Sequence, residues 1–192
     1  MQACRISARD LACRRGDRVL FHGVNIELAA GRALHIAGAN GIGKSSLLRI
    51  LAGLMRPFAG TLVNEGAIGL LDERPALDPI LPLGKALAFW QRMDGPFDNE
   101  LARLGLAELT DVPVRYLSTG QMKRAALARL LGQGAPVWLL DEPLNGLDGQ
   151  AVKLAQSLAS EHCAAGGICL IASHQPFAMP CMERLDLAEF AA

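Results

Sequence analysis

The chain has 192 residues and a formal net charge of zero, with 19 lysine and arginine residues against 19 aspartate and glutamate residues. This balance supplies no positive field to gather nucleic acid, so we expect no nucleic-acid partner. The length suits a single domain with a substantial core, and no apolar run approaches the roughly 18 residues that cross a bilayer.

The expected secondary structure alternates between strands and helices. Apolar and polar residues alternate near the start, which predicts an antiparallel opening, whereas bare apolar runs farther on predict buried strands of a parallel sheet. The expected strands lie at 3–12, 24–30, 33–37, 61–63, 67–71, 137–140 and 168–172. The expected helices lie at 47–51, 84–93, 98–106, 120–132 and 149–164. The N-terminus shows no signal-peptide pattern and the five cysteines include no C-x-x-C pair, so we expect a cytosolic chain with reduced thiols.

A glycine-rich loop separates the strand at 33–37 from the first helix. Its residues are Gly38-Ala39-Asn40-Gly41-Ile42-Gly43-Lys44-Ser45, which fit the phosphate-loop pattern G-x-x-x-x-G-K-[ST]. Glycines let backbone N–H groups point at a polyphosphate, Lys44 would reach the β- and γ-phosphates, and the Ser45 hydroxyl would help hold Mg²⁺. The alternative is a chance glycine-rich turn. The strand and helix on either side favour a nucleoside triphosphate site.

Asp141 and Glu142 follow the apolar run 137–140. One carboxylate at the end of a buried strand can hold Mg²⁺ through water, and a second can polarise the water that attacks a γ-phosphate. Two acidic residues could equally begin a turn. Their combination with the phosphate loop favours the chemical role.

A third motif, Leu117-Ser118-Thr119-Gly120-Gln121, opens a helix rich in alanine and leucine. Read alone, Ser118 is a helix N-cap. The stretch is also similar to the L-S-G-G-Q signature of the ABC ATPases, and the order of motifs along the whole chain resembles that family. The motifs are residues 38–45, 117–121, 140–143 (Leu-Asp-Glu-Pro), 144–148 (Leu-Asn-Gly-Leu-Asp) and His174.

The resemblance implies an α/β P-loop NTPase fold with a mostly parallel core sheet, an antiparallel β part and a helical subdomain. Residues 1–192 would form one ABC ATPase domain, with 1–74 and 133–192 as the core and 75–132 as the helical subdomain. A transmembrane subunit would dock on this subdomain, where Phe89 and Trp90 are candidate anchors unless they belong to the core.

The resemblance also implies a reaction and a composite site. Two copies would face each other head to tail and hydrolyse ATP with Mg²⁺, with Glu142 as general base, His174 and Lys44 on the γ-phosphate, and Ser45 and Asp141 as metal ligands. A strand-end histidine bonded to backbone is the plainer reading of His174. The residues expected to bind ATP are Arg15, Gly38, Asn40, Gly41, Gly43, Lys44, Ser45, Ser46, Ser118, Gly120, Gln121 and Asp148.

Within the family, the compact length and the stretches 11–18 and 172–176 look like the ATP-binding subunits of the haem exporters of cytochrome c biogenesis. That likeness implies a homodimer that is peripheral on the cytoplasmic face of the inner membrane and works with integral-membrane subunits. Another ABC exporter, of lipid, peptide or drug, and a non-transport ABC ATPase are the alternatives. The short distance between Ser45 and Leu117 and the neutral charge argue against the non-transport class.

Two positions depart from the family pattern. Arg15 stands where most members place an aromatic residue that stacks on adenine, and it either stacks in its place or is a solvated edge residue. Arg74 stands where a glutamine usually contacts Mg²⁺ and the membrane partner. Arginine cannot ligate a metal, so we expect slow hydrolysis by the isolated subunit.

Overall fold

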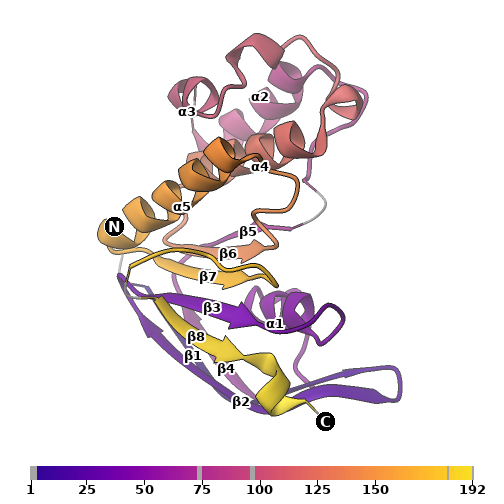
Figure 1. Ribbon diagram of the computed structural model, residues 1–192, viewed down its shortest axis with the longest axis vertical. Helices are drawn as coiled ribbons and strands as arrows, with labels where there is room; N and C mark the ends of the chain where they lie inside the picture. Colours follow the sequence, from indigo (N-terminus) through magenta and orange to yellow (C-terminus); the bar gives the residue numbers. More distant parts are fainter. Residues whose placement is uncertain (1–3, 73–74, 96–97, 181, 192) are drawn as a thin grey trace.

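The computed structural model describes residues 4–72, 75–95, 98–180 and 182–191 (Figure 1). Arg74 therefore lies outside the described residues, and the expectation about it stays a prediction. Among the described residues, no helix combines the length and the apolar character needed to cross a membrane.

The centre of the molecule is a five-stranded parallel sheet in the order β5-β6-β7-β3-β8. Every residue of the three inner strands is buried, because helices and a second sheet cover the two faces. This burial explains why these strands are bare apolar runs in the sequence. The strands are β3 (Ala33–Ala37), β5 (Ile68–Leu71), β6 (Val137–Asp141), β7 (Ile168–Ala172) and β8 (Met182–Asp186).

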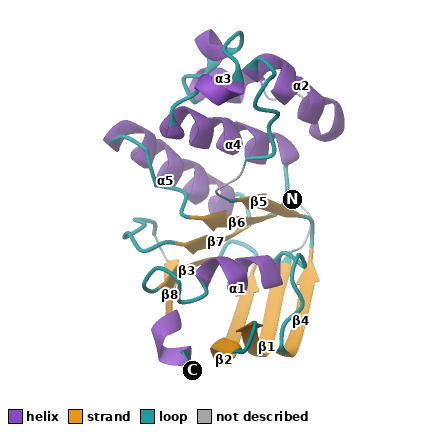
Figure 2. Ribbon diagram, turned by 90° about the vertical axis from the view of Figure 1, so that its right-hand side faces the viewer, coloured by secondary structure: helices purple, strands orange, loops and turns teal. Residues whose placement is uncertain are grey.

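A second, antiparallel sheet lies on one side of the parallel sheet, with α1 (Lys44–Leu51) between the two (Figure 2). It consists of β1 (Arg5–Arg15), β2 (Arg18–Ala29) and β4 (Ala59–Glu65), in the order β2-β1-β4. Apolar residues of α1 pack with both sheets in one buried cluster. The phosphate loop is therefore held between two sheets.

Helices cover the other face of the parallel sheet and extend away from it (Figures 1 and 2). α5 packs on β7 and α4 on β5, while α2 and α3 pack on α4. A second buried cluster joins these helices to the sheet. The helices are α2 (Leu83–Asp94), α3 (Asp98–Arg103), α4 (Thr119–Gln133) and α5 (Gly149–Ala164), with 3-10 turns at Ala107–Leu109, Val114–Tyr116 and Leu187–Phe190.

The predicted fold class is confirmed, and several element predictions need correction. The strand expected over 24–30 begins at Arg18, and the strand expected over 61–63 is Ala59–Glu65. The helix expected over 98–106 ends at Arg103, since Gly105 adopts a left-handed φ of 63°. β8, a parallel edge strand beside β3, was not among the expected strands. Its sequence, Met-Glu-Arg-Leu-Asp, gives neither an apolar run nor a clean alternation, because one edge faces solvent.

Trp90 is partly buried and packs against the core of the helical part. Its indole N–H donates to the carbonyl of Ala76 at 2.7 Å, and the Arg129 guanidinium lies 3.5 Å from the ring centroid. Phe89 is 49% exposed and stays available. Four of the cysteines, Cys4, Cys13, Cys163 and Cys169, are buried and free, as expected for reduced thiols; Cys181 lies outside the described residues.

Candidate functional site

The phosphate loop, residues 38–45, connects the C-terminal end of β3 to the N-terminus of α1. Gly43 needs to be glycine, because its φ is 118° and an added Cβ would lie 3.0 Å from the Phe21 ring. Since the first N–H groups of a helix lack partners within it, the start of α1 offers donors to an anion. Strand, loop and helix form the predicted context of the motif.

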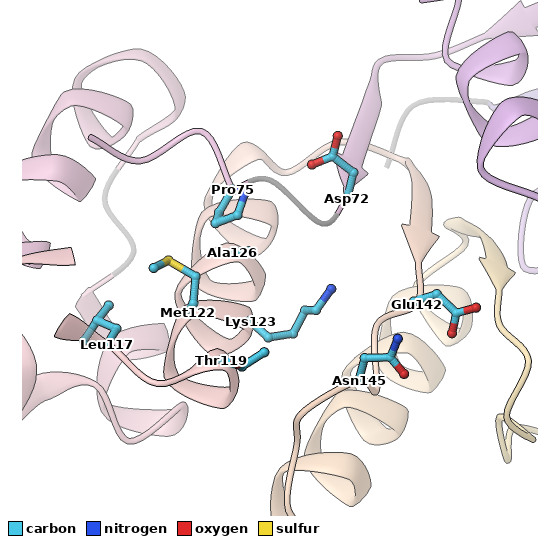
Figure 3. Close-up of a pocket in the computed structure, with 9 residues that line it drawn as sticks. All are labelled: Asp72, Pro75, Leu117, Thr119, Met122, Lys123, Ala126, Glu142 and Asn145. Atoms are coloured by element: carbon cyan, nitrogen blue, oxygen red, sulfur yellow. The ribbon is translucent and has the colours of Figure 1, made fainter. Parts of the chain in front are cut away.

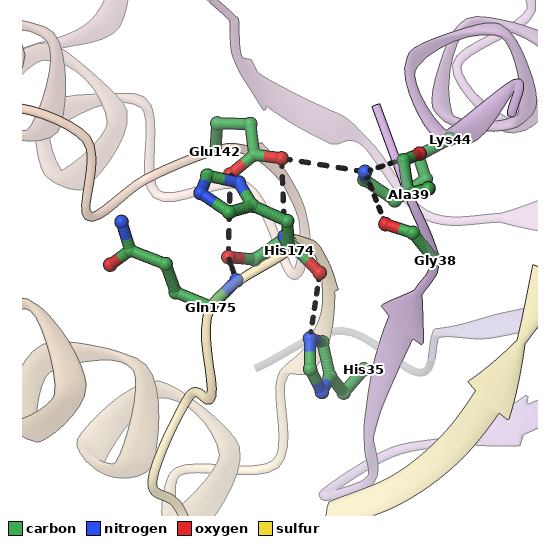
Figure 4. Close-up of polar contacts among 8 residues, drawn as sticks. His35, Gly38, Ala39, Lys44, Glu142, His174 and Gln175 are labelled. Carbon is green, nitrogen blue, oxygen red and sulfur yellow. Dashed lines mark hydrogen bonds and ion pairs between the residues drawn. The ribbon is translucent and has the colours of Figure 1, made fainter. Parts of the chain in front are cut away.

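Lys44 points into the loop and is 6% exposed. Its Nζ donates to the carbonyl of Gly38 at 2.8 Å and to that of Ala39 at 3.2 Å (Figure 4). The same Nζ lies 3.6 Å from Oε1 of Glu142. Lys44, expected on the γ-phosphate, and Glu142, the expected general base, therefore form a buried ion pair in the structure.

Glu142 follows β6 in a left-handed backbone conformation, with a φ of 45° that is rare for a residue with a side chain. Its N–H donates to the carbonyl of Ala172 at 2.8 Å, which fixes the turn on the neighbouring strand β7. The carboxylate accepts hydrogen bonds from Nδ1 of His174 at 2.9 Å, from the His174 N–H at 3.2 Å and from the Ser173 hydroxyl at 3.3 Å. Strained backbone held by surrounding contacts is typical of functional sites.

A cavity of ≈ 400 Å³ lies over the phosphate loop. Arg15 from the end of β1 lines it together with the loop and Glu142, so the structure brings Arg15 to the predicted nucleotide site. Burial raises the pKa of the neighbouring Cys13 thiol, and a hydrogen bond with Ser46 and the charge of Arg15 partly oppose this rise. The lining residues are Arg15, Leu20, Asn40, Gly41, Gly43, Lys44, Ser45, Ser46 and Glu142.

Gly38 and His174 line a neighbouring cavity of ≈ 500 Å³ on the side of β8. Asp141 is the last residue of β6 and is 4% exposed. The carboxyl ends of β3, β6 and β7 thus bring the phosphate loop, the two acidic residues and His174 to one edge of the sheet, where ligands of α/β sheets bind.

Segment 117–121 lies apart from the cavity over the phosphate loop. Ser118 caps α4 in a capping box with Gln121: the Ser118 Oγ accepts from the Gln121 N–H at 3.2 Å, and the Gln121 side chain accepts from the Ser118 N–H at 2.8 Å. Leu117 and Thr119 line a different cavity, of ≈ 390 Å³, between α4 and the turn after β6, and Glu142 lines this cavity as well as the one over the phosphate loop (Figure 3). In one chain, Ser118, Gly120 and Gln121 are thus not part of the wall around the phosphate loop.

Asp148 accepts from the N–H groups of Gln150 and Ala151 at 3.0 and 2.8 Å and so caps α5. The turn before it packs on the start of α4, because a Cβ on Gly120 would lie 2.7 Å from the Gly146 carbonyl oxygen. The predicted residues therefore form two groups: those around the phosphate loop, and those of the signature segment and the 144–148 turn.

Two residues of the polar network were absent from the predicted site. Ser173 is 1% exposed and its hydroxyl donates to the Glu142 carboxylate. The sequence feature that could have indicated it is its position next to His174. His35 is 8% exposed on β3, and its Nε2 lies 3.1 Å from the Ser173 carbonyl oxygen. For His35, the sequence feature was a histidine inside an apolar strand, because a buried polar side chain needs a hydrogen-bond partner.

Residues 21–145 match the family described as ABC transporter. The fold, the phosphate loop and the acidic residues at the strand ends agree with this match, and the chain belongs to the ABC transporter family as an ATP-binding subunit that couples ATP hydrolysis to transport.

Two relatives that are similar along nearly the whole chain carry the same name. The chain is 59% identical over 190 residues to the cytochrome c biogenesis ATP-binding export protein CcmA of Novosphingobium aromaticivorans, and this match covers 99% of each chain. It is 49% identical to the protein of the same name from Zymomonas mobilis, with 98% of this chain and 86% of that protein covered.

Solved structures agree with the fold. An ABC transporter ATP-binding protein from Pyrococcus furiosus superposes with a TM-score of 0.82 at 23% identity, covering 98% of this chain and 100% of that one. CbiO1 from Clostridium perfringens, part of the ABC transporter complex CbiONQ, superposes with a TM-score of 0.73 at 27% identity, covering 91% of this chain and 80% of that one.

Proposed function

We propose that the chain powers the haem exporter of cytochrome c biogenesis by hydrolysing ATP between two copies arranged head to tail. The observation that carries the composite site is the separation of the signature segment from the phosphate loop within one chain. Lys44 and Ser45 line the cavity over the phosphate loop, whereas Leu117 and Thr119 of the signature segment line another, and Glu142 lies between the two and lines both. A second copy is needed to bring a signature segment over the phosphate loop. The names of the relatives support the export function in cytochrome c biogenesis.

The residues present would divide the work of hydrolysis. Lys44 would exchange its contacts with the loop carbonyls for phosphate oxygens, which would release Glu142 from the ion pair. The freed carboxylate would accept a proton from the attacking water, and His174 would hold the γ-phosphate. Ser118 and Gly120 of the second copy, at the N-terminus of α4, would complete the site from the opposite side.

Mg²⁺ suits the donor atoms of this site. The Ser45 hydroxyl and the Asp141 carboxylate are hard oxygen ligands, and Mg²⁺ is usually held by one or two such groups, water and substrate phosphates. No cluster of three or more histidine, cysteine, aspartate or glutamate side chains among the described residues could form a cage of its own, which agrees with a metal that arrives with ATP. Mg²⁺ would neutralise the charge that develops on the phosphates.

We propose further that residues 75–132 form the helical subdomain of a single domain and receive the membrane subunits, at the cytoplasmic face of the inner membrane where ATP is available. Several large apolar side chains in this part of the chain are exposed, as a docking surface requires. They are Ile80, Leu81, Phe89, Met93 and Tyr116.

The test of the reaction is Glu142→Gln, which removes the base and keeps the size of the side chain. We expect hydrolysis to fall by at least about 100-fold while ATP now holds a stable dimer in sedimentation velocity. Glu108→Gln, on an exposed 3-10 turn, is the control and should hydrolyse ATP at the wild-type rate. A Glu142→Gln chain that stays monomeric in saturating ATP would contradict the composite site.

The test of the transported class is made in cells. Replacing the gene by one encoding Lys44→Ala should abolish covalent haem in c-type cytochromes, seen by haem staining of denaturing gels, with b-type cytochrome spectra unchanged. Normal c-type cytochromes in these cells would favour another exported molecule.

A further inference from the structure

His35 is a buried polar residue for which the proposed reaction gives no role. It lies in β3 between Leu34 and Ile36, both buried, three residues before the phosphate loop begins. Its Nε2 lies 3.1 Å from the carbonyl oxygen of Ser173. A carbonyl oxygen only accepts, so Nε2 of His35 carries the hydrogen of this bond.

The carbonyl that His35 binds belongs to the peptide group that holds the Glu142 carboxylate. The other end of this group is the N–H of His174, which donates to Oε1 of Glu142 at 3.2 Å (Figure 4). One peptide unit therefore links the imidazole of His35 to the proposed general base. Hydrogen bonds in such a chain polarise one another, so donation to the carbonyl strengthens donation by the N–H.

The Ser173–His174 pair supplies most of the contacts to that carboxylate. The Ser173 hydroxyl and Nδ1 of His174 both reach Oε2, at 3.3 and 2.9 Å, in addition to the N–H bond to Oε1. The His174 side chain is itself 40% exposed, so packing alone does not hold it. Its position depends on the backbone that carries it.

β3 holds that backbone from both sides of Ser173. The Ser173 N–H donates to the carbonyl of Ile36 at 3.2 Å, and the adjacent His35 binds the Ser173 carbonyl. The same strand continues directly into the phosphate loop. A single strand thus sets the distance between the loop and the histidine that are proposed to grip the same γ-phosphate.

We propose that His35 is a positioning residue for ATP hydrolysis, which orients the Ser173–His174 peptide so that Glu142 and His174 are aligned on the γ-phosphate. The inference rests on the proposed function. It assigns His35 no contact with ATP, so its loss should lower kcat and leave nucleotide binding intact.

Two variants separate this role from packing. His35→Leu keeps an apolar side chain of similar size but has no donor, and we expect kcat to fall about 10- to 100-fold with KM for ATP within about twofold of wild type. His35→Gln can donate from its amide to the same carbonyl and should recover kcat to within about threefold of wild type. ATP hydrolysis is measured on the full chain, alone and co-purified with its membrane subunits.

His162→Leu is the matched control, because Nε2 of His162 lies 3.2 Å from the Pro136 carbonyl oxygen in an equivalent bond remote from the phosphate loop. It should lower the melting temperature without lowering kcat. Equal kcat losses in His35→Leu, His35→Gln and His162→Leu would reduce His35 to a packing residue, and a wild-type kcat in His35→Leu would overturn the proposal.

A measurement without ATP keeps the two proposals distinguishable. Hydrogen exchange of the His174 amide, followed by NMR, should accelerate at least about tenfold in His35→Leu and remain slow in His35→Gln. If the wild-type chain hydrolyses no ATP, the proposed function fails, and the positioning inference, which rests on it, fails as well. If ATP is hydrolysed but the His174 amide exchanges at the same rate in His35→Leu, only the positioning role is overturned.

Discussion

Arg14 and Arg15 are neighbours at the end of β1 with different surroundings. The Arg14 guanidinium lies 4.5 Å from the centroid of the Phe58 ring. Arg15 lines the cavity over the phosphate loop, because successive side chains of a strand point to opposite faces. Of the residues that line this cavity, Arg15 has the only planar side chain large enough to stack on a base. A guanidinium stacks on any base without reading its hydrogen-bonding edge.

With Arg15 stacked on the base, the chain should therefore bind ATP and GTP with similar strength, with dissociation constants within about threefold of each other. Arg15→Ala should weaken both nucleotides by about 5- to 30-fold, since base stacking is worth about 1–2 kcal/mol. Fluorescence titration with labelled nucleotides measures the dissociation constants for ATP and for GTP. Arg14→Ala is the control and should bind as wild type does. A strong preference for ATP in the wild-type chain would contradict the stacking role.

At the scale of elements, the start of α4 and the turn before α5 are packed without spare room. Gly146 has a φ of 77°, and a Cβ there would lie 2.8 Å from Cγ2 of Thr119. Thr119 stands where the L-S-G-G-Q signature has glycine, and its methyl group lies against Gly146. The contact couples the signature segment to the 144–148 turn within one chain.

Gly146→Ala should destabilise the chain by about 1–3 kcal/mol, because it combines a left-handed φ with this clash. Thr119→Ala removes Cγ2, so the double variant should regain the part of the stability that the clash costs. The cost of the left-handed φ at residue 146 should remain. Urea denaturation of the four chains gives the coupling energy. Gly149→Ala, at the first position of α5 with no atom within 4 Å of its Cβ, is the control and should be neutral or stabilising. Additive effects of Gly146→Ala and Thr119→Ala would rule out the contact.

The elements predicted from the sequence are those whose burial leaves a pattern. β3, β6 and β7 are buried throughout and read as apolar runs, and α5 was predicted with the bounds that it has. β8 is exposed on one edge and leaves no such pattern. Bonds between distant residues are a different case. The contact of His35 with Ser173 spans 138 positions, and the φ of Glu142 follows from its bond to β7, so a local pattern reveals neither.

At the scale of the whole molecule, the signature segment of one chain lies apart from its own phosphate loop: Ser118 and Gly120 do not line the cavity that Lys44 and Ser45 line. Symmetric dimers commonly resolve such a separation, since each copy can complete the site of the other. Ser118 offers a way to test this without unfolding α4. Aspartate caps a helix as well as serine does, so Ser118→Asp keeps the cap but would put a carboxylate against the γ-phosphate.

Mixing two inactive chains then tests whether the site is shared. Lys44→Ala and Ser118→Asp homodimers should each lose at least about 100-fold in ATP hydrolysis. In an equal mixture, half of the dimers are mixed, and each has one intact site that joins the phosphate loop of one chain to Ser118 of the other. The mixture should recover up to about a quarter of wild-type activity. Ser118→Asn, a neutral cap, should stay active and serves as the control. Failure of the mixture to recover any activity, with both chains folded and mixed dimers formed, would contradict a scheme in which each composite site hydrolyses ATP independently.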